Sequence, residues 1–167
     1  IIYGLFGMIF FVVFLKWDYS LMAGAATAAI MVLPTILSTT KEALDAVPDS
    51  YREGSFALGT GKLRTIFKVV LPAAVPGILS GIILAIGRIV GETAALLYTS
   101  GTATRGLSKG LMSSGRTLAV HMYTISSEGF HTKQTFATAV ILLIFVFIIN
   151  TLSSVAAKQI SKKAGGQ

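Results

Sequence analysis

The sequence comprises 167 residues, of which 53% are hydrophobic and 13% are charged, and its formal net charge is +7. Soluble domains carry roughly 25% charged residues, so this composition argues against a soluble globular protein. The absence of cysteine excludes disulfides and thiolate metal sites. Basic residues lie between apolar blocks and at the C-terminal end, as membrane topology places them, so nucleic-acid binding is not indicated.

Four apolar segments predict an all-α fold, a polytopic bundle of transmembrane helices. Ile1–Leu15 reaches about 22 Å as a helix, short of the roughly 30 Å hydrocarbon core. We interpret it as the end of a longer helix, which implies that N-terminal helices are missing from this sequence. The other three segments are Tyr19–Leu37, Val69–Tyr98 and Thr135–Ala157, each long enough to span a bilayer.

The connecting segments predict an orientation in the membrane. Ser38–Lys68 and the C-terminal tail together carry eight Lys and Arg residues, whereas Lys16–Asp18 and Thr99–Gln134 together carry five. Cytoplasmic loops carry the excess of basic residues. We therefore expect Ser38–Lys68 and the C-terminus to lie in the cytoplasm.

The Ser38–Lys68 segment has a pattern of its own. Asp49-Ser50 offers an N-cap, and Glu53 follows Ser50 at capping-box spacing, so helices are expected here, interrupted at Gly59 and Gly61. Apolar positions recur among the charges, as in amphipathic helices. This pattern fits a helix on the lipid surface and a knob that docks into a partner about equally well.

The Thr99–Gln134 segment is rich in glycine, and within it Thr117–Ser126 fits a short helix or a strand equally. The glycine spacing of Gly101–Gly106 matches that of a phosphate-binding loop, but Leu107 replaces the required lysine, so we reject that motif. His121 and His131 have no carboxylate cluster near them, and no metal site is expected. The absence of catalytic motifs favours a conduit over an enzyme acting on lipids, and a purely structural subunit is the other alternative.

Two charges interrupt the apolar Val69–Tyr98 segment, Arg88 and Glu92. Intramembrane charges normally face a bundle interior or a water-filled cavity, and an arginine suits an anion. The alternative is an i,i+4 ion pair that acts only as structural glue. Helical spacing places the two charges on a stripe of small residues, which permits close helix packing. The stripe comprises Ala74, Gly77, Gly81, Ala85, Arg88, Glu92 and Ala95, and we also assign Gly87 and Gly91 to packing.

The run Glu53-Gly54-Ser55, followed by Gly59 and then Leu71-Pro72, resembles the "EAA" loop of ABC-importer permeases. Gly54-Ser55 stands in place of two alanines, and Val69 replaces the usual isoleucine. The resemblance implies a type I importer fold and a coupling helix that fits a groove on an ATPase subunit. It favours docking over a lipid-surface role for residues 38–68. The implied coupling residues are Tyr51, Arg52, Glu53, Gly54, Ser55, Gly59, Leu71 and Pro72.

The run Gly87-Arg88-Ile-Val-Gly91-Glu92-Thr93 resembles the phosphate permeases, and Leu33–Ile36 and Ser114–Leu118 are similar to their A-type member. The implied substrate pathway comprises Arg88, Glu92 and Thr93. The implied partners are a second homologous permease, an ATPase dimer that binds ATP and Mg²⁺, a periplasmic phosphate-binding protein, phosphate and lipid of the cytoplasmic membrane. This chain itself would hold no cofactor. A sulfate or molybdate permease is the alternative, because those permeases carry a related arginine.

Overall fold

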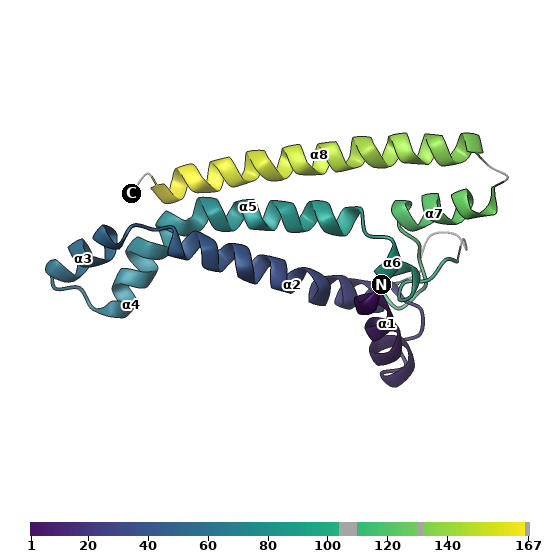
Figure 1. The fold of residues 1–167 in the computed structure, drawn as a ribbon, viewed down its shortest axis with the longest axis horizontal. Coiled ribbons are helices and arrows are strands. Elements are labelled where there is room, and N and C mark those ends of the chain that lie inside the picture. The colour runs from purple at the N-terminus through teal and green to yellow at the C-terminus, as the bar shows by residue number, and fades with distance from the viewer. Residues whose placement is uncertain (104–109, 130–131, 166–167) are drawn as a thin grey trace. The chain divides into compact units, whose positions relative to one another are not determined.

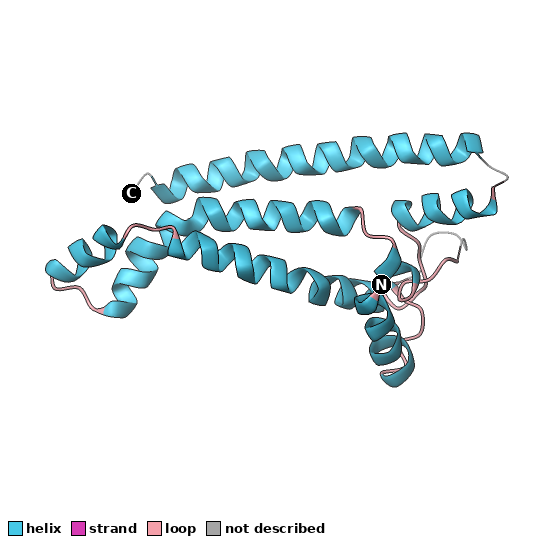
Figure 2. Ribbon diagram, viewed as in Figure 1, coloured by secondary structure: helices cyan, strands magenta, loops and turns pink. Residues whose placement is uncertain are grey.

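A computed structural model describes residues 1–103, 110–129 and 132–165, and every regular element in these ranges is a helix (Figures 1 and 2). The predicted all-α fold is thereby confirmed. Arg105, Lys109 and His131, which entered the charge count and the metal test, lie outside the described ranges. The chain divides into two compact units, Ile1–Leu33 with Gly87–Ile148, and Pro34–Ile86 with Ile149–Gln167. Each unit is described separately.

The first unit begins with α1 (Ile2–Gly7), which continues as the π-helical turn η1 (Met8–Phe14). The predicted helix at residues 1–15 is therefore present. Glycine allows α1 to pack closely against α6 (Ala94–Leu97), since a Cβ at Gly4 would lie 2.8 Å from the Cα of Ala95. Phe11 of η1 stacks on Trp17, with ring centroids 5.3 Å apart.

Main-chain carbonyls of a distant loop hold the start of α2 (Leu21–Asp45). The N–H of Ser20 donates to Thr99 (3.2 Å), that of Leu21 to Ser113 (3.1 Å) and that of Met22 to Leu111 (2.9 Å). The first amides of a helix have no partner within it, so these bonds satisfy groups that would otherwise need water. The described part of the predicted 99–134 loop is thus packed onto a helix end.

The first unit also contains α7 (Leu118–Glu128), which settles the ambiguity of residues 117–126 in favour of a helix. Thr117 caps its start, because its Oγ1 accepts a hydrogen bond from the N–H of Val120 at 3.3 Å. Gly129 follows its last residue with φ of +72°, a conformation that glycine adopts without strain. Val120 is fully buried and packs with Ala28 and Leu96.

In the second unit, α2 continues to Asp45, well beyond the predicted span end at Leu37. It is followed by α3 (Asp49–Ala57), α4 (Lys62–Thr65) and the π-helical turn η2 (Ile66–Val70), which leads directly into α5 (Leu71–Val90). The predicted interruption between Gly59 and Gly61 is present. The predicted capping box is wrong, because Pro48 is the N-cap of α3 and no side chain bonds to that helix end.

Small residues bring α2 and α5 together in this unit. A Cβ at Gly77 would lie 2.7 Å from the Cβ of Ala43, and one at Gly81 would overlap the hydroxyl of Thr39. Glycines at such positions let two helix backbones approach closely. These contacts fit the packing role expected for both glycines. Gly91 differs, because its nearest atoms would be 3.9 Å away in its own helix.

Three helices in the described residues are long and apolar enough to cross a membrane, namely Leu21–Asp45, Lys62–Val90 and Thr132–Ser161. The last lies within α8 (Thr132–Gly165), and none of the residues in its most apolar window is buried. Ile2–Phe14 is a shorter apolar helix. The multi-pass membrane character is confirmed. The predicted span Val69–Tyr98 is corrected, because the helix ends at Val90 and α6 is separate.

Candidate coupling hairpin and anion pathway

The turn between α3 and α4 is a Schellman motif centred on Gly59. The N–H of Gly59 donates to the carbonyl of Phe56 at 2.9 Å, and the N–H of Thr60 donates to that of Ser55 at 3.3 Å. This pair of bonds closes a helix whose following residue is left-handed, and Gly59 has φ of +76°. The interruption predicted at Gly59 is therefore a turn in which this glycine has positive φ. We call the segment from Asp49 to Thr65 the coupling hairpin.

Three side-chain hydroxyls meet inside the coupling hairpin, and we call this group the hydroxyl triangle. The Oγ of Ser55 in α3 lies 2.5 Å from the Oγ1 of Thr60 in the turn and 2.9 Å from the Oγ1 of Thr65 in α4. The two threonine oxygens are 3.1 Å apart. Ser55 and Thr65 are 8% and 2% exposed and Thr60 is half-buried, so the bond between Ser55 and Thr65 is the buried one.

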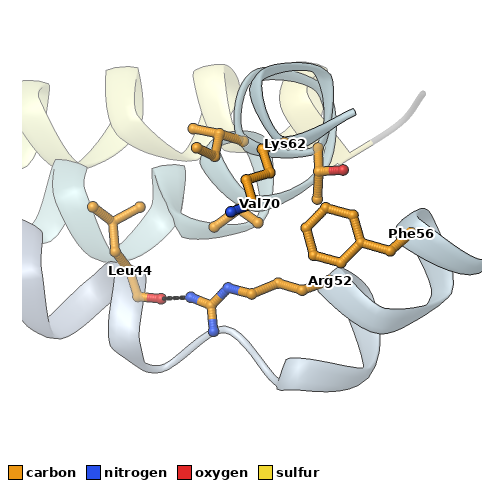
Figure 3. Close-up of a pocket in the computed structure, with 7 residues that line it drawn as sticks. Leu44, Arg52, Phe56, Lys62 and Val70 are labelled. Carbon is orange, nitrogen blue, oxygen red and sulfur yellow. Dashed lines mark hydrogen bonds between the residues drawn. The ribbon is translucent and has the colours of Figure 1, made fainter. Parts of the chain in front are cut away.

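Arg52 ties the coupling hairpin to the end of α2. Its Nη2 donates to the carbonyl of Leu44 at 3.0 Å (Figure 3). Its Nη1 pairs with Asp49 at 2.5 Å. The Leu44 carbonyl is one of the last in α2 and has no partner within that helix. A cation at a helix C-terminus also interacts favourably with the helix dipole. Arg52 therefore serves the fold of the hairpin and does not project as a free charge.

A pocket of about 400 Å³ lies between the end of α2, α3 and the α4–η2 segment (Figure 3). Aliphatic and aromatic side chains form most of its wall, while Arg52 and Lys62 supply its charges. Its lining residues are Leu44, Arg52, Phe56, Lys62, Thr65, Ile66 and Val70.

The outer side of the coupling hairpin exposes large apolar side chains. Leu58, at the tip before Gly59, is 85% exposed, and Leu63 and Tyr51 are 73% and 53% exposed. Glu53 and Gly54 are also exposed beside them. Clustered exposed apolar groups rimmed by charge mark an interaction surface. The residues grouped from the sequence as coupling residues therefore divide into two sets. Tyr51, Glu53 and Gly54 are exposed, whereas Ser55 and Arg52 form bonds within the hairpin and to α2.

Leu71 and Pro72 open α5, directly after the π-helical turn η2. Proline has no N–H and cannot donate to the preceding turn, and π-helical turns occur where the regular helix pattern is interrupted. Both residues are half-buried. Their position connects the coupling hairpin to the apolar helix that carries Arg88.

Arg88 lies in the last turn of α5 and is exposed, whereas Glu92 follows the helix end. The Glu92 Oε1 accepts a hydrogen bond from the N–H of Ala95 at 3.1 Å, beside Thr93 at the N-cap of α6. Because the helix stops at Val90, the i,i+4 spacing expected for these two charges is lost. Within the described ranges, Arg88 and Glu92 form no ion pair. The structural-glue alternative therefore has no contact to support it.

The long apolar helices of the described residues define a multi-pass membrane protein. Residues 2–165 match the family described as "Binding-protein-dependent transport system inner membrane component". The chain belongs to this family.

Relatives within the family include phosphate permeases. The chain is 40% identical over 158 residues to the phosphate transport system permease protein PstA of Yersinia pestis, covering 93% of this chain and 52% of the relative. It is 38% identical over 165 residues to a PstA homolog of Mycoplasma pneumoniae (92% and 25%). It is 35% identical over 141 residues to YqgI of Bacillus subtilis, a probable ABC transporter permease protein (77% and 48%).

The chain thus spans about half the length of the Yersinia and Bacillus relatives. No solved structure matches it significantly.

Sequence reasoning missed the hydroxyl triangle. Ser55, Thr60 and Thr65 are five residues apart in turn, a spacing that corresponds to no helical face, so no periodic signal links them. The combination of a hydroxyl residue in α3, a glycine turn and a hydroxyl residue after it was the available clue.

Proposed function

We propose that the chain is part of a permease subunit in an ATP-driven ABC importer that moves inorganic phosphate across the cytoplasmic membrane. The subunit itself is non-catalytic. Its partners are a second homologous permease, an ATPase dimer that binds ATP and Mg²⁺, and a periplasmic phosphate-binding protein. Membership of the binding-protein-dependent family and two relatives with phosphate transport in their names support this proposal.

The observation that carries the proposal is the exposed apolar face of the coupling hairpin. The large apolar side chains of Tyr51, Leu58 and Leu63 are exposed, whereas the small polar side chains of Ser55 and Thr65 are buried. A rigid, apolar knob of this kind fits an apolar groove on a partner. The ATPase subunit is that partner, and the hairpin transmits its movement to α5.

Arg88 attracts the anion in the proposed pathway. A guanidinium offers a planar fork of donors that matches the oxygens of phosphate, and no carboxylate occupies Arg88 in the described residues. Glu92 is four residues further along the chain, and its carboxylate is held by a bond to the Ala95 N–H of α6. Its negative charge offsets part of the attraction of Arg88 for the anion. Thr93 supplies a hydroxyl beside it. An anion is thereby attracted without being trapped.

The function is tested with the full-length complex in proteoliposomes supplied with its binding protein. Phosphate should stimulate ATP hydrolysis, and radiolabelled phosphate should accumulate on the side that carries the ATPase, whereas sulfate and molybdate should do neither. Stimulation by sulfate or molybdate would refute phosphate as the substrate. If none of the three oxyanions stimulates ATP hydrolysis, transport is refuted.

The proposed orientation has its own test. A cysteine introduced at the exposed Arg64 should react with an impermeant maleimide only in inside-out vesicles. One introduced at the exposed Thr102 should react only in intact spheroplasts. The opposite labelling pattern would place the coupling hairpin outside the cell and exclude its role in docking the ATPase.

A further inference from the structure

We infer that the hydroxyl triangle of Ser55, Thr60 and Thr65 is a positioning element that keeps α3 fixed to α4 throughout the transport cycle. This inference rests on the proposed function, because it concerns how movement of the ATPase reaches the membrane helices. It assigns to three residues a role in coupling that is separate from the contact with the ATPase itself.

Proton accounting shows that the triangle is complete. The Thr60 hydroxyl lies 2.6 Å from the carbonyl of Ser55, which can only accept, so Thr60 donates there. Ser55 then donates to Thr60, and Thr65 donates to Ser55. The Thr65 hydroxyl also lies 3.3 Å from the Gly61 carbonyl at the start of its own helix. The Ser55–Thr65 bond is the one that joins α3 to α4, because the backbone bond from Thr60 to Ser55 already closes the turn between them.

Beside the two Schellman bonds, the triangle adds the side-chain restraint on this turn. A Cβ at Gly59 or Gly61 would find no atom within 4 Å, so these two positions contribute no packing of their own. Arg52 connects α3 to α2, through the Leu44 carbonyl, and leaves α4 untouched. The triangle is the buried polar connection from α3 to α4 in the described structure.

What the triangle fixes is continuous with the membrane. Thr65 is the last residue of α4, and the chain runs on through η2 into α5, so Lys62–Val90 is one long apolar helix. A displacement of the exposed Leu58 tip is therefore delivered to the helix that carries Arg88. Without the triangle, α3 would swing about the glycine turn and the displacement would be lost there.

The test measures phosphate transported per ATP hydrolysed in the full-length complex. Thr65→Val keeps the side-chain shape and removes the hydroxyl from α4. Ser55→Ala removes the partner hydroxyl from α3. Thr65→Val, which removes the bond between α3 and α4, should lower the ratio about fivefold, the factor expected for the loss of one net hydrogen bond. Ser55→Ala removes two bonds of the triangle and should lower the ratio at least as much. Thr65→Ser keeps the hydroxyl and should retain the ratio.

Ser80→Ala is the matched control, because this exposed serine in α5 bonds only to the carbonyl of Pro76 within its own helix. It should leave the ratio unchanged. Co-purification of the ATPase and its basal hydrolysis should persist in Thr65→Val, Thr65→Ser and Ser80→Ala, since none of these residues belongs to the exposed docking face.

A second experiment does not depend on the stability of those variants. The chain has no cysteine, and the Oγ atoms of Ser55 and Thr65 are 2.9 Å apart, so the pair Ser55→Cys, Thr65→Cys places two sulfurs near bonding distance. In a complex without other cysteines, diamide takes two electrons and two protons from the thiols and leaves an S–S bond. The oxidised complex should transport with the normal ratio, because the link stays closed during the cycle.

The outcomes separate the two proposals. If the parent complex shows phosphate-stimulated hydrolysis but Thr65→Val and Ser55→Ala keep its ratio, the positioning role is refuted alone. Loss of transport on forming the disulfide, reversed by reduction, also refutes it, because the triangle would then have to open. A parent complex that no oxyanion stimulates refutes the proposed function instead.

Discussion

Substitution of Gly59 is expected to loosen the coupling hairpin through backbone strain alone. An alanine Cβ at this position would meet no atom within 4 Å, so no steric contact opposes it. The φ of +76° is the only penalty, and a left-handed conformation costs an alanine about 1–2 kcal/mol. Gly59→Ala should therefore raise the open population of the turn about 5- to 30-fold.

Amide hydrogen exchange in the assembled complex measures this directly. The N–H of Thr60, which bonds to the Ser55 carbonyl across the turn, should exchange faster by the same factor in Gly59→Ala. Gly59→Asn should exchange less rapidly than Gly59→Ala, because asparagine tolerates the left-handed region better.

Gly54 provides the matched control, since it is exposed within α3 and a Cβ at this position would also meet no atom within 4 Å. Gly54→Ala should slow exchange of the Thr60 N–H, because alanine in a helix interior is more stable than glycine by about 1 kcal/mol. Equal exchange rates for the parent and Gly59→Ala would show that the Schellman turn does not restrain the hairpin, and would refute the reasoning.

Three further predictions concern the membrane helices. Arg88→Gln should abolish phosphate uptake while assembly and basal ATP hydrolysis persist, and normal uptake would exclude Arg88 from the pathway. Glu92→Ala should lower the free energy of unfolding of the complex by about 1 kcal/mol, because the Ala95 N–H of α6 loses its acceptor. Glu92→Gln keeps an acceptor and should not lower it. Equal melting temperatures for both variants would contradict this. Gly81→Ala should lower the free energy of unfolding by about 1–3 kcal/mol because its Cβ overlaps Thr39, whereas Gly91→Ala should leave it unchanged. Circular-dichroism melts of the purified subunit measure both. An unchanged stability in Gly81→Ala would mean that α2 and α5 can move apart without penalty.

The helices that cross the membrane were predictable because long apolar runs carry their own signal. Their ends were not. Lys41, Glu42 and Asp45 end the apolar run after Leu37, but lysine and glutamate are good helix formers in water, so α2 continues to Asp45. The opposite occurs at Val90, where α5 ends although the sequence stays largely apolar, and the Glu92 carboxylate accepts a bond from the Ala95 N–H in the first turn of α6. Local hydrogen bonding decided that boundary, and hydropathy does not register it.

The coupling hairpin was predictable as a surface but not as a structure. Gly59 indicated that the helices are interrupted, and the structure shows a turn there in which Gly59 has positive φ. The inward roles of Ser55 and Arg52 depend on Thr65 and on the Leu44 carbonyl, which come near only once the hairpin has folded. Sequence spacing alone therefore grouped buried and exposed residues together.

The way α2 begins has a consequence for anion binding at that helix end. A helix N-terminus with free amides is a ready-made site for phosphate. Here the amides of Ser20, Leu21 and Met22 already donate to carbonyls of the chain itself. These three amides are therefore not available to an anion, and the start of α2 differs in this respect from helix ends that bind phosphate through unpaired N–H groups.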